Sequence, residues 1–478
     1  MSRWHAPCEE LARMIPIFNH YVPGRLIFLA GLEAVVLLLA AYVGISLHFA
    51  DPGAGVSGAL AAAPTHALFF ACGMLIVMSG MGLYQPDLWQ SGQAVGVRLV
   101  AAFLLGFLVT GLVSYVVPSL YLEPHQIAGV VVLALAGTAL VRTAFHKWSN
   151  LGVFKSRVLV LGTGSRVMRL AEFAQRNPNH VIVGYVSLQQ PSKHYIPLPH
   201  VLPMEPGESL LSVVQKHGID EIVIAVRDRR GGGFPVQQLL ECRLKGVKVT
   251  ELASFFEREH RQMLLESLNP SWMVLGDGFR QSLARQIVKR AFDLAASLAL
   301  LVIAAPVMLL TAVCISLEGG LPILYRQARV GEGGRTFTLY KFRSMKNDAE
   351  HDGTPRWAAT DDDRATCVGR VIRKLRIDEL PQIVNVLKGD MSFVGPRPER
   401  PYFVDQLSGQ IPYYALRHAV KPGITGWAQV RYPYGASVDD SVEKLQYDLY
   451  YVKNHGLFLD IMILIDTVQV VLWGKGAR

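Results

Sequence analysis

The stretch LAASLALLVIAAPVMLLTAVCISL, which runs from Leu294 to Leu317, decides how the second half of this chain meets a membrane. Its 24 residues carry no charge, and as one straight α-helix they would extend ~36 Å, enough to cross about 30 Å of hydrocarbon. Pro306 lies in the middle of the stretch, where its ring removes a backbone N–H donor and clashes with the preceding turn. The length alone favours a span, whereas the proline favours a break.

Basic residues flank both ends of this stretch. Arg285, Lys289 and Arg290 precede it, and Arg326, Arg329 and Arg335 follow it. Because Lys and Arg collect on the cytoplasmic side of membrane proteins, both ends are expected on that same face. We therefore predict a re-entrant helix–break–helix over residues 286–317, which keeps the rest of the chain cytoplasmic and against the membrane surface.

The first 150 residues contain four further apolar segments. They are Leu26–Leu47, His66–Tyr84, Val95–Val117 and Gln126–Phe145. Each is close to the ~20 residues that a membrane-spanning helix needs. The loops at residues 51–65 and 118–125 contain no Lys or Arg, whereas the others do, so the N-terminus is predicted to be cytoplasmic. Residues 1–150 are thus predicted to form a four-helix transmembrane anchor, in which Glu33 snorkels or pairs rather than marking function.

Composition narrows the function classes. Hydrophobic residues make up 51% and charged residues 18%, which indicates a membrane protein with soluble parts. The net charge of +9 suits basic cytoplasmic loops, anionic lipid or phosphorylated substrates. Nucleic acid is not an expected partner, because the chain has no arginine-rich arm, helix-turn-helix or zinc pattern. Five scattered cysteines without a C-x-x-C pair argue against a disulfide framework or a structural zinc site.

The segment RVLVLGTGSRVMRLAEFAQRNPNHVIVGYVS, residues 157–187, alternates strand, glycine turn, helix and strand. Two further strand patterns follow, IDEIVIAV and GVKVTEL, so residues 151–268 are predicted to form an α/β Rossmann-like (CoA-binding-like) cytoplasmic domain. Gly162 and Gly164 match the first two glycines of a dinucleotide fingerprint, but the third position is Val167 and no acid closes the second strand. Tight turns are the favoured role of these glycines, and regulatory nucleotide binding is the alternative.

The stretch RIDELPQIVNVLKGDMSFVGPRPER, from Arg376 to Arg400, places the carboxylates Asp378 and Glu379 side by side among basic residues. With KRAFD, YRQARVGEGGRTFTLYKFRSM and KPGITGWAQV, it resembles the bacterial sugar transferase family, the polyprenyl-phosphate glycosyl-1-phosphotransferases. The resemblance covers residues 285–478 in order and implies an α/β-type catalytic domain there. The anchor and the Rossmann-like module resemble the large, multi-domain members. The tail is most similar to the exopolysaccharide subgroup associated with exosortase systems.

The resemblance implies an enzyme that transfers a sugar-1-phosphate from a UDP-sugar to undecaprenyl phosphate, with release of UMP. Asp378 is the implied nucleophile, which forms a phosphosugar–aspartate, and Glu379 is an implied ligand of Mg²⁺, with Mn²⁺ as a possible substitute. A metal ion and arginines suit this chemistry, because an anionic nucleophile must approach an anionic diphosphate. The implied location is the bacterial cytoplasmic (inner) membrane, with a multi-pass chain, a cytoplasmic catalytic domain and a homodimer.

Several other side chains are candidates for the site. Arg373 and Lys341 are suited to phosphates near the dyad, and Arg397 to the nucleotide diphosphate, because a guanidinium binds phosphate oxygens in pairs. Further substrate-binding candidates are Arg343 and Arg400. Asp390 either completes the metal shell or orients an arginine.

The membrane-proximal residues leave alternatives open. Lys289, Arg290 and Asp293, near Pro306, either contact substrate or serve as lipid-phosphate anchors and a salt bridge at the membrane surface. His418 and His455 are expected to be structural. The tail GLFLDIMILIDTVQVVLW is predicted to be an interfacial amphipathic helix, because two aspartates interrupt its apolar run.

Two rival functions stand beside the transferase. A nucleotide-sugar pyrophosphatase would transfer the same phosphosugar to water. A non-enzymatic assembly platform for polysaccharide machinery would be expected to have lost the dyad, which is intact here. A plain helix-start acid pair is the structural alternative for the dyad itself.

Overall fold

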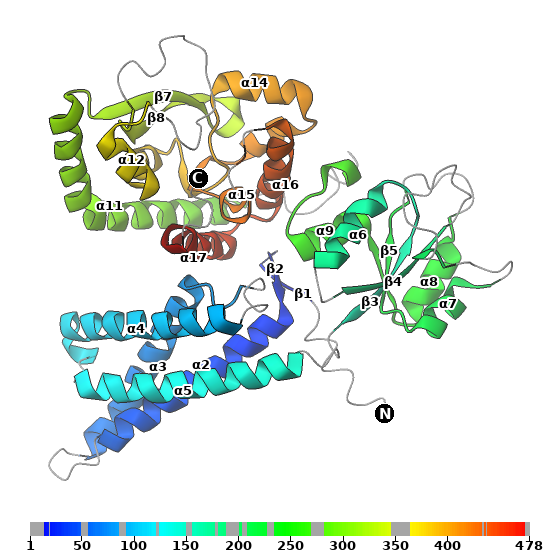
Figure 1. Ribbon diagram of the computed structural model, residues 1–478, viewed down its shortest axis with the longest axis horizontal. Coiled ribbons are helices and arrows are strands. Elements are labelled where there is room, and N and C mark those ends of the chain that lie inside the picture. Colours follow the sequence, from blue (N-terminus) through cyan, green and yellow to red (C-terminus); the bar gives the residue numbers. More distant parts are fainter. Residues whose placement is uncertain are drawn as a thin grey trace. The chain divides into compact units, whose positions relative to one another are not determined.

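The computed structural model describes most of the chain. The described residues are 14–18, 20–48, 56–85, 92–120, 124–149, 155–176, 180–187, 200–202, 208–226, 234–268, 282–345, 364–432, 435 and 437–473. The chain divides into two compact units, which are Met1–Ile17 with Tyr21–Glu259, and Phe18–His20 with His260–Arg478 (Figure 1).

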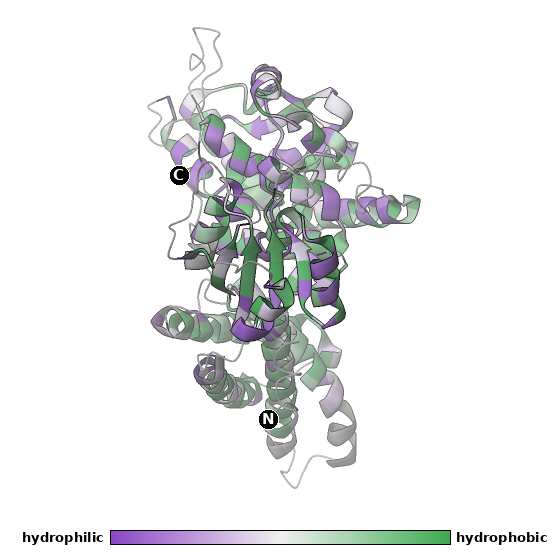
Figure 2. Ribbon diagram, turned by 90° about the vertical axis from the view of Figure 1, so that its right-hand side faces the viewer, coloured by the Kyte–Doolittle hydropathy of each residue, from purple (hydrophilic) through white to green (hydrophobic). Residues whose placement is uncertain are grey.

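Four long helices dominate the start of the first unit. They are α2 (Gly24–His48), α3 (Val56–Gly80), α4 (Gly92–Val116) and α5 (Pro124–Ser149). Two short paired strands precede them, β1 (Met14–Ile17) and β2 (His20–Pro23). The helices pack through a shared apolar core that includes Leu37, Phe70 and Phe103, and Figure 2 shows them in mostly hydrophobic colours. All four predicted apolar helices are therefore confirmed.

The second of these helices, α3, ends earlier than predicted. Among the described residues, four helices are long and apolar enough to cross a membrane: Gly24–Ser46, Gly92–Val116, His125–Trp148 and Leu283–Gly319. The apolar part of α3, Pro64–Gly80, is shorter. The predicted second segment continued to Tyr84, but the residues after Gly80 form turns in which Gly82 takes a φ of 81°. A left-handed glycine of this kind ends the helix.

A parallel α/β sheet forms the second part of the first unit. Its strands are β3 (Ser156–Leu161), β4 (His180–Val186), β5 (Glu221–Ile224) and β6 (Lys248–Glu251), hydrogen-bonded in the order β4-β3-β5-β6. The helices between and after them are α6 (Arg166–Arg176), α7 (Leu210–His217), α8 (Val236–Leu244) and α9 (Leu252–His260). In Figure 2 the strands are coloured as hydrophobic, as expected for a sheet covered on both faces.

The glycine turn after β3 has a purely conformational explanation. Gly162 has a φ of 121°, and a Cβ there would lie 3.3 Å from the backbone of Ala225. Around Gly164 a Cβ would meet no atom within 4 Å. Gly162 therefore serves a tight turn beside the end of β5, and nucleotide binding at this turn stays a prediction.

The apolar stretch of the second unit lies in α11 (Leu283–Gly319), one helix of 37 residues with Pro306 inside it. Helical structure continues through the proline, so the predicted break is absent from the helix itself. Figure 1 shows the α11 ribbon running in two directions joined by a bend. Proline removes one hydrogen bond and pushes on the preceding turn, which bends a helix whose other hydrogen bonds persist. The re-entrant path through a membrane stays a prediction.

The rest of the second unit is a mixed α and β arrangement. An antiparallel hairpin of β7 (Leu324–Val330) and β8 (Thr336–Phe342) turns through η5 (Glu332–Gly334). The elements that follow are α12 (Cys367–Lys374), η6 (Ile377–Gln382), α13 (Ile383–Lys388), β9 (Ser392–Val394), α14 (Pro401–Gln410), η7 (Tyr414–Ala419), β10 (Gly423–Thr425), α15 (Trp427–Arg431), α16 (Val438–Asn454) and α17 (Leu457–Trp473). Strands β9 and β10 are parallel. The large core side chains are Trp427, Tyr450 and Tyr451.

The predicted tail helix is present as α17, and its two aspartates face inward. Asp460 is fully buried and lies 2.7 Å from the Lys289 ammonium, while Asp466 lies 3.0 Å from Arg431. Apolar side chains of the same helix, Ile461 and Val468, are exposed. This polarity suits a helix whose outer face meets lipid, and its interfacial location stays a prediction.

Candidate active site

The dyad lies on a short 3₁₀-helix between two helices. Asp378 and Glu379 are both in η6, and each is 8% exposed. Arg376, just before it, takes a left-handed backbone with a φ of 59°, which turns the chain from α12 into η6. Neighbouring residues on a 3₁₀-helix point about 120° apart, so the two carboxylates are free to take different partners.

Buried polar contacts fix the helices on either side of the dyad. Asn385 on α13 is fully buried, and its amide pairs with the backbone of β8, accepting from Tyr340 N at 3.1 Å and donating to Thr338 O at 2.7 Å. The carboxylate of Glu318, at the end of α11, accepts from the backbone N–H groups of Cys367 and Val368 at the start of α12. An acid at a helix N-terminus is stabilising, so α11 and β8 hold the dyad from both sides.

Three cations surround Glu379, and all three approach the same oxygen. Its Oε1 lies 2.9 Å from Arg397 Nη2, 3.1 Å from Lys341 Nζ and 3.7 Å from Arg376 Nη1. Among the described residues, no hydrogen bond or short ion pair reaches Glu379 Oε2 or either carboxylate oxygen of Asp378. The two acids therefore differ: Glu379 is tied to the cations, and Asp378 is open.

The two carboxyl groups also differ in acidity. Burial raises the pKa of Asp378, the charge of Glu379 raises it further, and the nearby cations only partly oppose this. Burial acts in the same direction on Glu379, but Arg397, Lys341 and Arg376 together hold its pKa well below its usual range. Burial lowers the pKa of the Lys341 ammonium. Glu379 is thus the fixed anion, and Asp378 is the more basic carboxylate.

The residues fit a magnesium ion in one respect and not in another. Mg²⁺ usually takes one or two carboxylates and completes its shell with water and substrate phosphates, and Asp378 and Glu379 supply such oxygens. Asp390 does not join them: within the described ranges, no group of three or more His, Cys, Asp or Glu side chains is arranged to hold a metal. Its role as a metal ligand stays a prediction.

The other predicted phosphate-binding arginines lie elsewhere. Arg343 is buried and donates to Gly320 O at 2.7 Å, just after α11. Arg373 on α12 is half-buried, and no ion pair among the described residues links it to the dyad. Arg400 is half-buried at the N-terminus of α14. Lys341 and Arg397 are thus the two predicted basic residues that the structure brings to Glu379.

The membrane-proximal candidates are engaged inside the second unit. Lys289 Nζ lies 2.7 Å from Asp460 and donates to Val394 O at 3.2 Å. Arg290 donates to the carbonyls of Val386 and Leu387, which belong to the last turn of α13. Asp293 is buried and accepts from Ser392 Oγ at 3.0 Å and Phe393 N at 3.1 Å. These side chains join α11 to α13, β9 and α17, and their role as substrate contacts or lipid-phosphate anchors stays a prediction.

The sequence analysis missed Arg376 and Arg329 as parts of this site. Arg376 lies two positions before Asp378, has a left-handed backbone, and reaches Glu379 three positions further on. Arg329 on β7 binds the PRPE segment that carries Arg397. Both residues lie inside the quoted motifs, so their positions were visible in the sequence, but nothing in the pattern separated them from the other basic residues.

Known proteins share these motifs. The model of a family described as bacterial sugar transferase matches residues 284–474. A UDP-N-acetylgalactosamine-undecaprenyl-phosphate N-acetylgalactosaminephosphotransferase of Aeromonas hydrophila is 35% identical over 86% of this chain and 95% of its own length. The chain belongs to the bacterial sugar transferase family.

Other members of the family carry different sugar names. A UDP-glucose:undecaprenyl-phosphate glucose-1-phosphate transferase of Xanthomonas campestris pv. campestris is 31% identical over 73% of both chains. An undecaprenyl-phosphate galactose phosphotransferase of Salmonella typhimurium is 40% identical over 40% of this chain and 42% of its own. The similarity to the Aeromonas and Xanthomonas members extends well beyond the catalytic segment, and that to the Salmonella member covers about as much of the chain as this segment.

Proposed function

We propose that this protein transfers a sugar-1-phosphate from a UDP-sugar to undecaprenyl phosphate and releases UMP, as the first step of exopolysaccharide or glycoconjugate assembly. The family and the names of its members support this reaction class. The observation that carries the mechanism is the asymmetry of the dyad. One buried carboxylate is occupied by three cations, and its neighbour is open and more basic.

In the proposed reaction Asp378 is the nucleophile. A carboxylate oxygen of Asp378 attacks the phosphorus that bears the sugar, and the bond from that phosphorus to UMP breaks. An oxygen of undecaprenyl phosphate then attacks the same phosphorus and returns the electron pair to the carboxylate. Each step exchanges one phosphoryl bond for another, so no separate energy source is required, and covalent catalysis divides the transfer into two displacements.

The cations supply the electrostatic part of this proposal. Arg397 and Lys341 bind Glu379 in the resting protein, and Arg376 lies just beyond them. Together they carry more positive charge than the dyad carries negative charge, so a diphosphate is attracted to the site. Glu379 and Asp378 would hold Mg²⁺, which neutralises diphosphate charge when bound.

The membrane arrangement is part of the same proposal. The long helices and the family relatives support a multi-pass membrane protein. We place it in the cytoplasmic membrane with the catalytic unit on the cytoplasmic side. The bent α11 would then be re-entrant and would bring the dyad to the level of the lipid phosphate. A homodimer remains a prediction.

The test uses purified, detergent-solubilised protein with Mg²⁺ and a panel of UDP-sugars, including those named for the relatives. UMP release and intact protein mass are measured with and without undecaprenyl phosphate, for the wild type, Asp378→Asn and Glu379→Gln. We expect lipid-dependent turnover and a phosphosugar adduct that is lost in Asp378→Asn, with a rate decrease of at least about 10³-fold.

Two outcomes would contradict the proposal. UMP release without a lipid product would identify a nucleotide-sugar pyrophosphatase that transfers to water. Wild-type turnover in Asp378→Asn would show that another group is the nucleophile.

A further inference from the structure

The segment that carries Arg397, residues 396–399, has no regular secondary structure of its own. It connects Gly395, which follows β9, to the N-terminus of α14. Two of its residues, Pro396 and Pro398, have no backbone N–H. A loop of this kind holds its shape only if its carbonyl groups find donors elsewhere.

All four successive carbonyls of this segment do find a donor, and the donors come from three elements of the unit, β10, η7 and β7. Pro396 O accepts from Gly423 N at 3.0 Å, Arg397 O from Arg417 Nη2 at 3.0 Å, Pro398 O from Arg329 Nη1 at 3.0 Å, and Glu399 O from Val330 N at 2.9 Å. The outer two bonds come from backbone groups. The inner two come from arginine side chains, which hold the carbonyl of Arg397 and the one after it.

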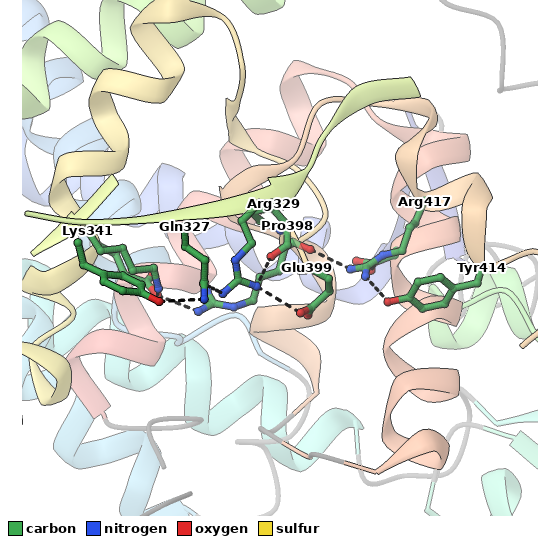
Figure 3. Close-up of polar contacts among 11 residues, drawn as sticks. Gln327, Arg329, Lys341, Pro398, Glu399, Tyr414 and Arg417 are labelled. Carbon is green, nitrogen blue, oxygen red and sulfur yellow. Dashed lines mark hydrogen bonds and ion pairs between the residues drawn. The ribbon is translucent and has the colours of Figure 1, made fainter. Parts of the chain in front are cut away.

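Arg417 is itself fixed on every side. It is 6% exposed, its Nε and Nη2 lie 3.1 and 2.7 Å from Asp448 Oδ2, and its Nη1 donates to Tyr414 Oη at 2.7 Å. Figure 3 shows Arg417 between Tyr414 and the loop. A guanidinium with four of its five N–H donors engaged has little rotational freedom, so the Arg397 carbonyl has a rigid donor.

Arg329 binds the next carbonyl from the opposite side. Its Nη2 donates to Gln327 Oε1 at 2.6 Å and its Nη1 lies 3.5 Å from Glu399 Oε2, so the β7 strand sets its direction (Figure 3). Burial lowers the pKa of its guanidinium, as does the charge of Arg397, although Glu399 opposes both.

We propose that Arg417 and Arg329 are positioning residues for the transferase, and that they fix the Arg397 backbone so that its guanidinium meets the dyad. The proposal rests on the proposed function, because Arg397 is the group that contacts Glu379. Neither arginine needs to touch the substrate. A misplacement of about 1 Å in a catalytic group can cost on the order of 100-fold in rate, so the loss of either bond should slow the chemistry of correctly folded molecules.

The first experiment measures the burst of UMP release by Arg417→Lys in the detergent-solubilised full-length protein, with excess UDP-sugar and no undecaprenyl phosphate, so that each competent molecule releases one UMP as it forms the phosphosugar–aspartate. The amplitude reports the fraction of competent protein, and the rate constant reports the chemistry of that fraction. We expect a rate constant about 10- to 100-fold lower than that of the wild type, with most of the amplitude retained. A lower amplitude with an unchanged rate constant would mean that Arg417 only supports folding.

A double-mutant cycle identifies the residue through which Arg417 acts. If Arg417 works through Arg397, then Arg397→Lys with Arg417→Lys should be about as slow as Arg397→Lys alone, because coupled residues are not additive. Arg431→Lys is the matched control: it also removes an arginine from a buried ion pair of the same unit, with Asp466 at 3.0 Å. Its effect should multiply with that of Arg397→Lys. Multiplicative effects of Arg417→Lys and Arg397→Lys would overturn the proposal.

A measurement without turnover separates this inference from the proposed function. Hydrogen–deuterium exchange of Val330 and Gly423, whose N–H groups donate to Glu399 O and Pro396 O of the loop, should be faster in Arg417→Lys and in the milder Arg329→Lys, and unchanged in Arg431→Lys. Unchanged exchange in both loop variants would refute the positioning role even in an active enzyme. If the wild type turned over no UDP-sugar, the transferase function would fail, and this exchange would still decide whether these arginines hold the loop.

Discussion

Each unit of this protein has a buried glutamate in contact with arginine. The two sites differ in whether the charge of that glutamate is balanced by a single partner. In the first unit Glu33 is fully buried, and both of its oxygens are used. Its Oε1 lies 2.7 Å from Arg142 Nε, and its Oε2 accepts from Tyr84 Oη at 2.6 Å and Arg142 Nη2 at 3.0 Å. One acid and one base meet in a paired, two-point contact, which confirms the prediction that Glu33 pairs.

In the second unit the charges do not balance one to one. Three cations approach one oxygen of Glu379, and the second acid, Asp378, has no such partner. In a closed pair such as Glu33–Arg142 the two charges neutralise each other, so the pair has no charge left to bind a ligand and serves to join helices. The open cluster keeps a surplus of positive charge and an unused nucleophile, which suits it to bind a diphosphate and react with it.

After loss of the nucleophile Asp378 itself, the comparison predicts the largest effect on chemistry from Glu379→Gln. The change keeps the shape of the side chain but leaves three cations facing each other without the central anion. We expect a single-turnover rate about 10²- to 10³-fold lower, the size seen when one electrostatic contact of an active site is removed. Single-turnover UMP release over a series of Mg²⁺ concentrations checks this.

The same measurement on a control variant tests whether the two sites differ in function. Glu33→Gln is the control, since it removes a buried acid of the other unit, and it should leave the rate constant of folded protein unchanged. If Glu379→Gln and Glu33→Gln had equal effects on that rate constant, the dyad cluster would be as structural as the pair in the anchor.

Glu33→Gln should instead act on stability. Removing one partner of a buried ion pair leaves the other charge unpaired, at a cost of about 3–5 kcal/mol. The melting temperature in detergent should fall sharply, and Glu33→Leu with Arg142→Leu should recover most of the loss, because an apolar pair leaves no charge behind. If the double variant melted no higher than Glu33→Gln, the pair would have a role beyond neutralising itself.

The helices and strands of this protein could be predicted from its sequence better than the contacts between their side chains. The apolar runs, the alternating α/β segment and the dyad motif carry strong local signals, and the helices and the parallel sheet followed them. The end of α3 was placed too late, because the left-handed Gly82 that stops it depends on tertiary packing. The break at Pro306 became a bend for a similar reason: the surrounding hydrogen bonds decide how far a proline disrupts a helix.

At the site, sequence reasoning found the acids but could not assign a partner to each of the bases. Lys341 and Arg397 reach Glu379, whereas Arg343 binds the chain just after α11 and Lys289 binds Asp460 on α17. A basic residue near an acidic motif is equally consistent with a phosphate, a lipid or a distant carboxylate. Only the folded chain brings Asp460 to Lys289 across 171 positions, so no local pattern could have separated these roles.

A buried titratable group can also be kept neutral, and this adds a third case to the comparison. Burial and the adjacent Arg417 lower the pKa of His418 from 6.5 to about 4. Below pH 6.5 the unfolded chain therefore binds a proton that the folded chain does not, so the unfolding free energy falls as the pH drops from 6.5 to about 4. His418→Phe should reduce this slope in melting temperatures recorded across that window. An unchanged slope would mean that other buried groups, such as His20, account for the acid sensitivity.

The smallest expected effect concerns Arg376, the weakest of the three cations at Glu379. It lies 3.7 Å away, its side chain is 40% exposed, and its φ of 59° is unfavourable for a residue with a Cβ by about 1–2 kcal/mol. Arg376→Gly and Arg376→Ala both remove the charge, and an exposed ion pair is worth only about 0–1 kcal/mol, so each should slow single-turnover UMP release by about 5-fold at most. Only the glycine relieves the backbone, so Arg376→Gly should melt at a higher temperature than Arg376→Ala. Equal melting temperatures would show that the left-handed turn before the dyad carries no strain. A rate loss near that of Glu379→Gln would show that Arg376 contributes as much to the chemistry as Glu379 does.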